Sequence, residues 1–120
     1  MTLDPVVTNP RHYSVVFEND RVRVLEYQDV PGERTTPHQH PDSVMYTLST
    51  FRRRLVSGGG DREVQLDAGT VGWLPAQEHH GENIGDTPTH VIFVELKEPG
   101  PTAAGARAAA SPGDLGPQTS

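Results

Sequence analysis

His38 and His40 are the residues of this 120-residue chain best placed to do chemistry. They lie one residue apart in the stretch TPHQHPD, residues 36–42, and the flanking prolines disfavour a helix. In an extended strand, positions i and i+2 point to the same face, about 6.6 Å apart. Two imidazoles at that separation can bind one metal ion at about 2.0–2.1 Å from each ring nitrogen. A solvated loop is the alternative, and a third ligand elsewhere in the chain would decide between them.

The composition restricts both the ligands and the partners. The net charge of −6 gives no support for binding nucleic acid or an anionic membrane surface. The chain has no cysteine, so a metal must be held by His, Asp, Glu or backbone oxygen. The N-terminus has neither the basic nor the apolar region of a signal peptide, and no segment approaches the roughly 20 apolar residues of a membrane span. We therefore expect a soluble cytoplasmic protein.

Short β-strands at regular spacing dominate the pattern. Runs rich in β-branched and aromatic residues, separated by turn residues, predict strands at 13–17, 22–27, 43–48, 51–56, 63–66, 70–75 and 89–96. With the extended His38–His40 stretch this gives about eight strands and no helix, which predicts an all-β sandwich or jelly-roll barrel. The stretch from His79 to Asn83 is expected to be a loop.

The chain is predicted to hold one domain, at residues 11–98. Residues 1–10 are expected to form a short extended arm. From 99 to 120 the composition changes to Gly, Pro, Ala, Ser and Thr, with Leu115 the only bulky apolar residue. Such a tail cannot bury enough surface to offset its ordering entropy, so we predict disorder there.

Two spaced motifs resemble those of a known family. Gly32-x5-His38-x-His40 is similar to the first cupin motif, and Gly69-x5-Pro75-x4-His80 to the second. The resemblance implies a double-stranded β-helix (jelly-roll) cupin barrel, a homodimer, and a metal bound by His38, His40 and His80. His79 is the other candidate for the third ligand, but its register with Pro75 is less favourable. His90 is expected to be a wall residue, and His12 to be exposed.

The match departs from the cupin pattern at the carboxylate ligand. Val44 and Met45 occupy the positions where cupins usually carry a glutamate. Three neutral histidines leave a divalent ion at +2, which favours an anionic, chelating substrate. The set resembles the three-histidine cupins that use iron(II) and O2, so Fe(II) is favoured, with Zn, Ni or Mn as alternatives. Asp42, Glu33 or Glu78 would be the replacement if a carboxylate does fill the gap.

Other residues are candidates for roles around the metal. Tyr46 shares parity with His38 and His40, so in a continuous strand its phenol would enter the barrel. There it would either donate a hydrogen bond to substrate or pack in the core with its hydroxyl satisfied. Glu82 and Asp42 are candidates to accept a hydrogen bond from a ligating histidine, and for each the alternative is a solvated surface position. Trp73 is expected to pack in the core. Arg53 would hold a substrate carboxylate if its face is inward; the alternative is that the arginine run forms a charged edge strand.

These observations predict a mononuclear metal-dependent cupin that acts on a small, chelating, oxygen-rich or enolisable metabolite. A non-haem iron(II) oxidoreductase of the dioxygenase type is favoured, with Tyr46 and Glu82 as its catalytic residues. A non-redox isomerase or lyase is one alternative, and a non-catalytic binding protein is another. The expected partners are a small-molecule substrate and a second copy of the chain, with no nucleic acid and no membrane.

Overall fold

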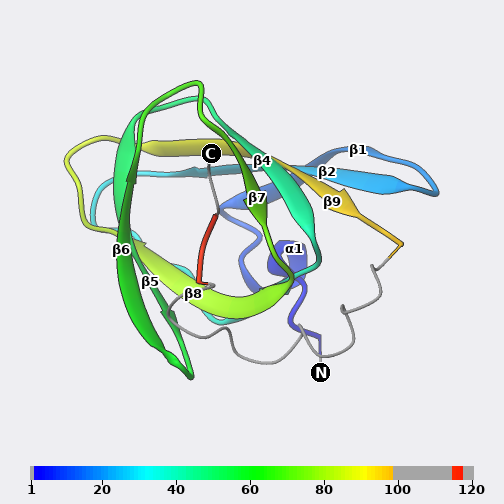
Figure 1. The fold of residues 1–120 in the computed structure, drawn as a ribbon, viewed down its shortest axis with the longest axis horizontal. Helices are drawn as coiled ribbons and strands as arrows, with labels where there is room; N and C mark the ends of the chain where they lie inside the picture. Colours follow the sequence, from blue (N-terminus) through cyan, green and yellow to red (C-terminus); the bar gives the residue numbers. More distant parts are fainter. Residues whose placement is uncertain (1, 99–114, 118–120) are drawn as a thin grey trace.

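The computed structural model describes residues 2–98 and 115–117, which form two antiparallel β-sheets facing each other (Figure 1). One sheet has the strand order β1-β2-β9-β4-β7 and the other β3-β8-β5-β6. The strands are β1 Tyr13–Glu18, β2 Val22–Asp29, β3 His38–His40, β4 Ser43–Thr47, β5 Phe51–Ser57, β6 Gly60–Leu66, β7 Val71–Leu74, β8 Gln77–Asn83 and β9 Thr89–Leu96. This is the predicted all-β jelly roll. The stretch His79–Asn83, which was expected to be a loop, is part of strand β8.

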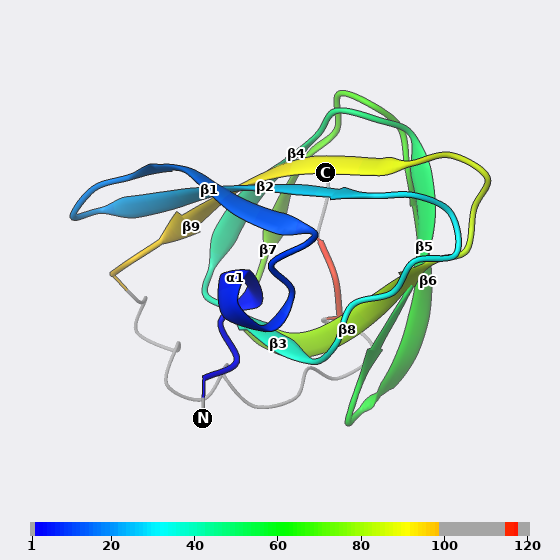
Figure 2. The same cartoon turned by 180° about the vertical axis from the view of Figure 1, so that it is seen from behind.

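The N-terminal arm is helical over one turn rather than extended. Helix α1 spans Pro5–Thr8, with proline at its first position and the Asp4 side chain accepting a hydrogen bond from the Val6 N–H at 3.0 Å. Before the helix, the Leu3 carbonyl accepts from the Gln39 N–H at 2.8 Å, so the arm lies along the free edge of β3 (Figure 2). The described part of the chain contains no helix long and apolar enough to cross a membrane.

The apolar core fills the space between the sheets. Alternate residues along each strand point inward, and the buried members of this cluster come from both sheets. They are Tyr13, Leu25, Tyr27, Met45, Phe51, Leu74, Val91 and Phe93. Most belong to the five-stranded sheet, so the four-stranded sheet is left to face that core with polar side chains, including the histidines.

The chain changes sheets between β3 and β4, so the residues of β4 that point inward are the opposite set from the one expected for a continuous strand. Pro41 and Asp42 separate the two strands, and β3 belongs to the four-stranded sheet whereas β4 belongs to the five-stranded one. Met45 therefore points into the core, and Tyr46 is 44% exposed on the outer surface. The prediction that Tyr46 shares the inner face of the histidines is wrong, because the strand is not continuous.

Two further expectations about side chains are corrected. Trp73 is 37% exposed on the outer face of β7 and is not part of the buried core. Strand β5 pairs with β6 on one side and β8 on the other, so the arginine run is not on an edge strand. Arg52 and Arg54 point outward, and each contacts Glu63 at 3.1 Å, whereas Arg53 is buried. Alternation along β5 thus separates one arginine from its neighbours.

A short part of the C-terminal region packs against the barrel. Leu115 is fully buried against Leu55 and Val64 on β5 and β6, and its carbonyl accepts from Arg62 at 3.1 Å. Figures 1 and 2 show this segment in red between the two sheets. Leu115–Pro117 depart from the expected disorder because one leucine fills an apolar gap at the sheet. The rest of the predicted tail, 99–114 and 118–120, lies outside the described residues.

Candidate metal centre

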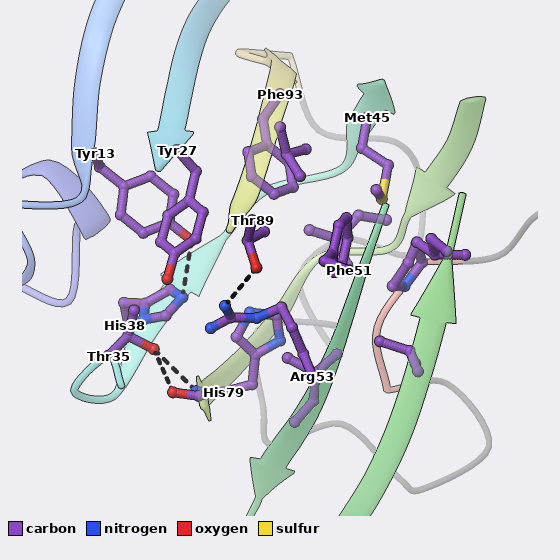
Figure 3. Close-up of a pocket in the computed structure, with 17 residues that line it drawn as sticks. Tyr13, Tyr27, Thr35, His38, Met45, Phe51, Arg53, His79, Thr89 and Phe93 are labelled. Atoms are coloured by element: carbon purple, nitrogen blue, oxygen red, sulfur yellow. Dashed lines mark hydrogen bonds between the residues drawn. The ribbon is translucent and has the colours of Figure 1, made fainter. Parts of the chain in front are cut away.

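Three buried histidines meet on the inner face of the four-stranded sheet. Strands β3 and β8 pair so that His38 lies directly opposite His79, and His40 follows two residues later on the same face as His38. The three ring centroids are 4.9–5.0 Å apart, and one ring nitrogen from each lies within 4.8 Å of the other two. Figure 3 shows His38 and His79 pointing into the interior.

The third histidine of this cluster is His79, not His80. In β8 the buried positions alternate from Gln77 through His79 to Asn83, so His80 points to the other face. His80 was predicted because this stretch was expected to be a loop, with the third ligand placed by its spacing from Pro75. The stretch is instead a strand, and its antiparallel pairing with β3 determines which of its side chains point inward. His12 and His90 lie apart from the cluster, with the Gln28 carbonyl at 3.1 Å and the Glu26 carboxylate at 2.6 Å as their partners.

Two of the histidines are oriented through Nδ1. The Nδ1 of His38 is 2.7 Å from the Thr36 carbonyl, and that of His79 is 2.7 Å from the side-chain oxygen of Gln77. Both partners are acceptors, so each Nδ1 carries the proton and each Nε2 keeps its lone pair. This is the arrangement that histidines binding a metal through Nε2 require.

The third histidine faces a carboxylate that sequence reasoning missed. His40 Nδ1 and Glu95 Oε2 are 3.5 Å apart, and both are buried atoms without a hydrogen-bond partner among the described residues. Arg23 holds the other Glu95 oxygen at 2.8 Å and also contacts Asp4 at 2.8 Å. A shift of about 0.5 Å would bring His40 and Glu95 within hydrogen-bond range. Nothing in the local sequence of β9 marks Glu95, because only the β2–β9–β4 pairing brings it here.

The carboxylates expected near the metal lie elsewhere. Glu82 is on the outer side of β8, 3.6 Å from Arg34, so the catalytic role predicted for it is not supported by its position. Asp42 accepts from the Ala76 N–H at 2.9 Å, Glu33 from the Val30 N–H at 3.1 Å, and Glu78 from Gln39 at 3.4 Å. Among the described residues the cluster therefore consists of histidines alone.

Tyr13 occupies the position that Tyr46 was expected to fill. Its hydroxyl is 3.4 Å from Nε2 of His38 and 3.3 Å from Nε2 of His40. Burial raises the pKa of this phenol, so Tyr13 keeps its proton and can donate it in a hydrogen bond. The sequence gives no sign of this role, because an inward-facing tyrosine at the start of a strand is also what an ordinary core residue looks like.

Burial keeps His38 and His79 neutral. It lowers the pKa of His38 to about 3, with the neighbouring His40 as a second cause, and it lowers the pKa of His79 well below the usual value in the same way. Neutral imidazoles are the form that binds metal. One ring nitrogen of each histidine lies within 4.8 Å of the other two, so the cluster is compact enough to fit one divalent cation, which imidazole nitrogens bind at about 2.1 Å.

The neutral histidines make the metal-free fold sensitive to acid. The unfolded chain has histidines with a pKa near 6.5, whereas His38 folds with a pKa of about 3, so between these values only the unfolded chain binds the proton. Stability is full above pH 6.5 and falls as the pH is lowered, by up to about 1.4 kcal/mol per pH unit for each such histidine. Urea denaturation of metal-free protein between pH 6.5 and 4.5 measures this slope.

The variants His79→Ala and His80→Ala are the matched pair for that measurement. We expect His79→Ala to reduce the dependence of stability on pH by the contribution of one histidine, about 1.4 kcal/mol per pH unit at most. His80→Ala should leave the contribution of His79 in place, because His80 lies on the other face of β8. A wild-type stability that does not change over this pH range would contradict the burial of neutral histidines.

Comparison with known proteins gives matches at the level of structure. No family model matches the chain. No curated protein matches it either.

Solved structures match most of the chain. A cupin domain from Bordetella pertussis Tohama I is 31% identical with a TM-score of 0.67, covering 72% of this chain and 92% of that one. An uncharacterised protein with a double-stranded β-helix domain from Klebsiella pneumoniae is 27% identical with a TM-score of 0.56, covering 73% and 78%. The polyketide cyclase RemF from Streptomyces resistomycificus is 22% identical with a TM-score of 0.53, covering 74% and 66%, which is a likeness of fold.

The first of these similarities extends beyond the fold. Identity of 31% along nearly the whole Bordetella domain accompanies the same all-β architecture. Together with the histidines that the first sequence motif brings to the inner face of β3, it shows that the chain belongs to the cupin family.

Proposed function

We propose that this cupin is a mononuclear metal-dependent enzyme in which His38, His40 and His79 bind one divalent ion. The observation that carries the proposal is the convergence of three buried imidazoles, each with one ring nitrogen within 4.8 Å of the other two. The Nδ1 contacts of His38 and His79 leave their Nε2 atoms available as ligands. Burying polar side chains has a cost in free energy, and a metal ion would offset it. The proposed substrate is a small chelating metabolite, oxygen-rich or enolisable.

The ion and the surrounding residues would have separate tasks. A bound iron(II) would supply Lewis acidity and the capacity to activate O2, and three protein ligands leave positions open for substrate. Tyr13 is the proposed hydrogen-bond donor to substrate, since its hydroxyl lies beside the Nε2 atoms of His38 and His40. Glu95 would orient His40 by accepting from Nδ1 and raise the basicity of that ligand.

The donor set also fits two alternatives. Zinc, nickel or manganese accept imidazole ligands, and such an ion would polarise a carbonyl for isomerase or lyase chemistry without redox. A non-catalytic cupin would bind metal and metabolite and release the metabolite unchanged. We favour the iron(II) oxidoreductase because the all-histidine ligand set resembles that of the three-histidine cupins that use iron(II) and O2.

The histidine pair on β8 provides the sharpest test of the metal site. His79→Ala removes a proposed ligand, and His80→Ala changes the adjacent residue on the opposite face. Saturating metal should raise the melting temperature of wild-type protein and of His80→Ala, since an ion at about 100 times its Kd stabilises the fold by about 2.7 kcal/mol. It should not raise that of His79→Ala.

Metal content measured on the same three samples controls for a change in folding alone. The wild type and His80→Ala should retain about one ion per chain after desalting, and His79→Ala much less. Retention of metal by His79→Ala and its loss from His80→Ala would reverse the assignment. A wild type that binds no metal would end the proposal.

The kind of chemistry is tested by oxygen consumption. Protein loaded anaerobically with iron(II) is supplied with O2 and a panel of β-diketones, flavonols and small acids. We expect O2 uptake above the rate of free iron(II) with at least one class, and a loss of at least tenfold in Tyr13→Phe at unchanged metal content. Turnover only with zinc, nickel or manganese would favour the isomerase or lyase alternative. No turnover with any metal would favour the non-catalytic binding protein.

We also propose that a second copy of the chain covers the outer face of the five-stranded sheet. Two cross-strand rows of apolar side chains lie on this face: Val94, Val44 and Trp73 in one, and Ile92, Tyr46 and Val71 in the other. The face measures roughly 600 Å², of the same order as the about 800 Å² that each partner contributes to a standard interface. A second copy is the occupant favoured because a face of this size suits a symmetric dimer.

Light scattering coupled to size exclusion tests this interface. The wild type should elute with about twice the 13.1 kDa mass of the chain. Tyr46→Glu places a charge at the centre of the face and should give a monomer, whereas Val7→Glu, on exposed helix α1, should not. A wild-type monomer at micromolar concentration would contradict the proposal.

A further inference from the structure

A small cavity lies between the sheets, with the histidine cluster in one wall and an arginine in another. Its volume is about 60 Å³, and Met45, Phe51, Val91 and Phe93 are among the residues that make most of it apolar. His38, His79 and Arg53 are the nitrogen-bearing side chains that line it (Figure 3). The function proposed above uses the histidines but gives no role to Arg53.

Arg53 is held firmly at one corner of its guanidinium. It is only 7% exposed, and its Nη1 donates to Asp29 and, at 3.2 Å, to the Thr89 hydroxyl. Asp29 is itself saturated, because it also accepts from the Tyr27 hydroxyl at 2.5 Å and from the Asn83 amide at 3.0 Å. Asp29 and Thr89 therefore hold the Nη1 end of the arginine in place.

The charge of Arg53 is retained in this environment. Burial alone would lower the pKa of the guanidinium, but the neighbouring Tyr27 and Asp29 outweigh it and raise the pKa. The Tyr27 ring centroid lies 5.1 Å from Cζ, within the range of a cation–π contact. Arg53 is thus a permanently charged donor next to an apolar cavity.

The opposite edge of the guanidinium has no partner. Among the residues that the structure describes, Nε and Nη2 make no hydrogen bond, although the side chain is buried. Nη2 lies against Gly81, where an added Cβ would come within 3.0 Å of it. Gly81 follows His79 by two residues on the inner face of β8, so this edge lies roughly 6–7 Å along the strand from the histidine cluster.

We propose that the cavity binds a small carboxylate that spans this distance. Its carboxylate would accept from Nε and Nη2 of Arg53, and an oxygen on the adjacent carbon would face His38 and His79, the two cluster histidines that line the cavity. The second contact rests on the metal proposed above, whereas the first depends on Arg53 alone. A guanidinium edge matches a carboxylate with two parallel hydrogen bonds.

The size of the cavity limits the ligand. At roughly 10–15 Å³ for each water-sized group, it admits about five non-hydrogen atoms without rearrangement. Short 2-hydroxy or 2-oxo acids have this size and carry the second oxygen next to the carboxylate. Flavonols and other large polyphenols do not fit. The size of the cavity and the charge of Arg53 therefore restrict the proposed metabolite to a small acid.

Calorimetric titration of zinc-loaded protein with glycolate and with its neutral isostere glycolamide tests the inference. Zinc avoids oxygen chemistry, and the zinc content of each sample is measured first. The wild type should bind glycolate at least tenfold more tightly than glycolamide. Because a metal ion alone also prefers an anion, the preference must then be measured with Arg53 changed.

Two variants separate Arg53 from the metal. In Arg53→Gln/Asp29→Asn the buried pair is replaced as a unit, so no uncompensated charge remains. Its preference for glycolate should fall below about threefold at unchanged zinc content. Arg53→Lys keeps the charge but loses the paired N–H groups, so its preference should be intermediate, and this variant suffices if the double variant does not fold.

The possible failures are distinguishable. An equal preference in the wild type and the variants would show that the metal alone selects the anion and would overturn the carboxylate site. The same conclusion would follow if zinc binds but glycolate does not. If no zinc binds, the metal proposal fails, and the metal-free protein must still prefer glycolate to glycolamide for the Arg53 site to stand.

Discussion

The register between β3 and β8 is the constraint on which the rest of the site depends. Because His38 lies directly opposite His79, both point inward, and His40 completes the triangle from the next inward position of β3. A shift of one residue would bring His80 inward and, at the same time, expose Gln77, Gly81 and Asn83, since side chains alternate between the faces of a strand. The histidine cluster and the packing of β8 are therefore set together.

The same strand connects the histidines to the other polar group of the interior. Gln77 orients His79 and also accepts from the Gly116 N–H at 2.8 Å, Gly81 leaves room for Arg53, and Asn83 bonds to Asp29. Buried polar groups cost free energy unless they are hydrogen-bonded, and here most are. Two buried atoms without partners, His40 Nδ1 and Glu95 Oε2, face each other across 3.5 Å. Arg53 lines the cavity, where a ligand would supply hydrogen bonds to Nε and Nη2.

The sequence predicted the fold and two of the three clustered histidines because those features are local. Strand alternation, turn residues and the His-x-His pair can all be recognised within a few positions. Tyr46 was misplaced because the alternation of the His38–His40 strand was extended past Pro41, where the chain changes sheets. His80 was chosen because residues 79–83 were taken for a loop, although they form part of a strand. Glu95, Tyr13 and the free edge of Arg53 depend on strand pairings far apart in sequence, which no local pattern encodes.

The most direct test of the account is a crystal structure of metal-loaded protein with an anomalous difference map at the metal edge. We expect one peak about 2.1 Å from Nε2 of each of His38, His40 and His79, with no carboxylate among its ligands. Glu95 should lie within hydrogen-bond distance of His40 Nδ1. A peak that includes His80, or the absence of any peak at the cluster in protein shown to contain one ion per chain, would contradict the account.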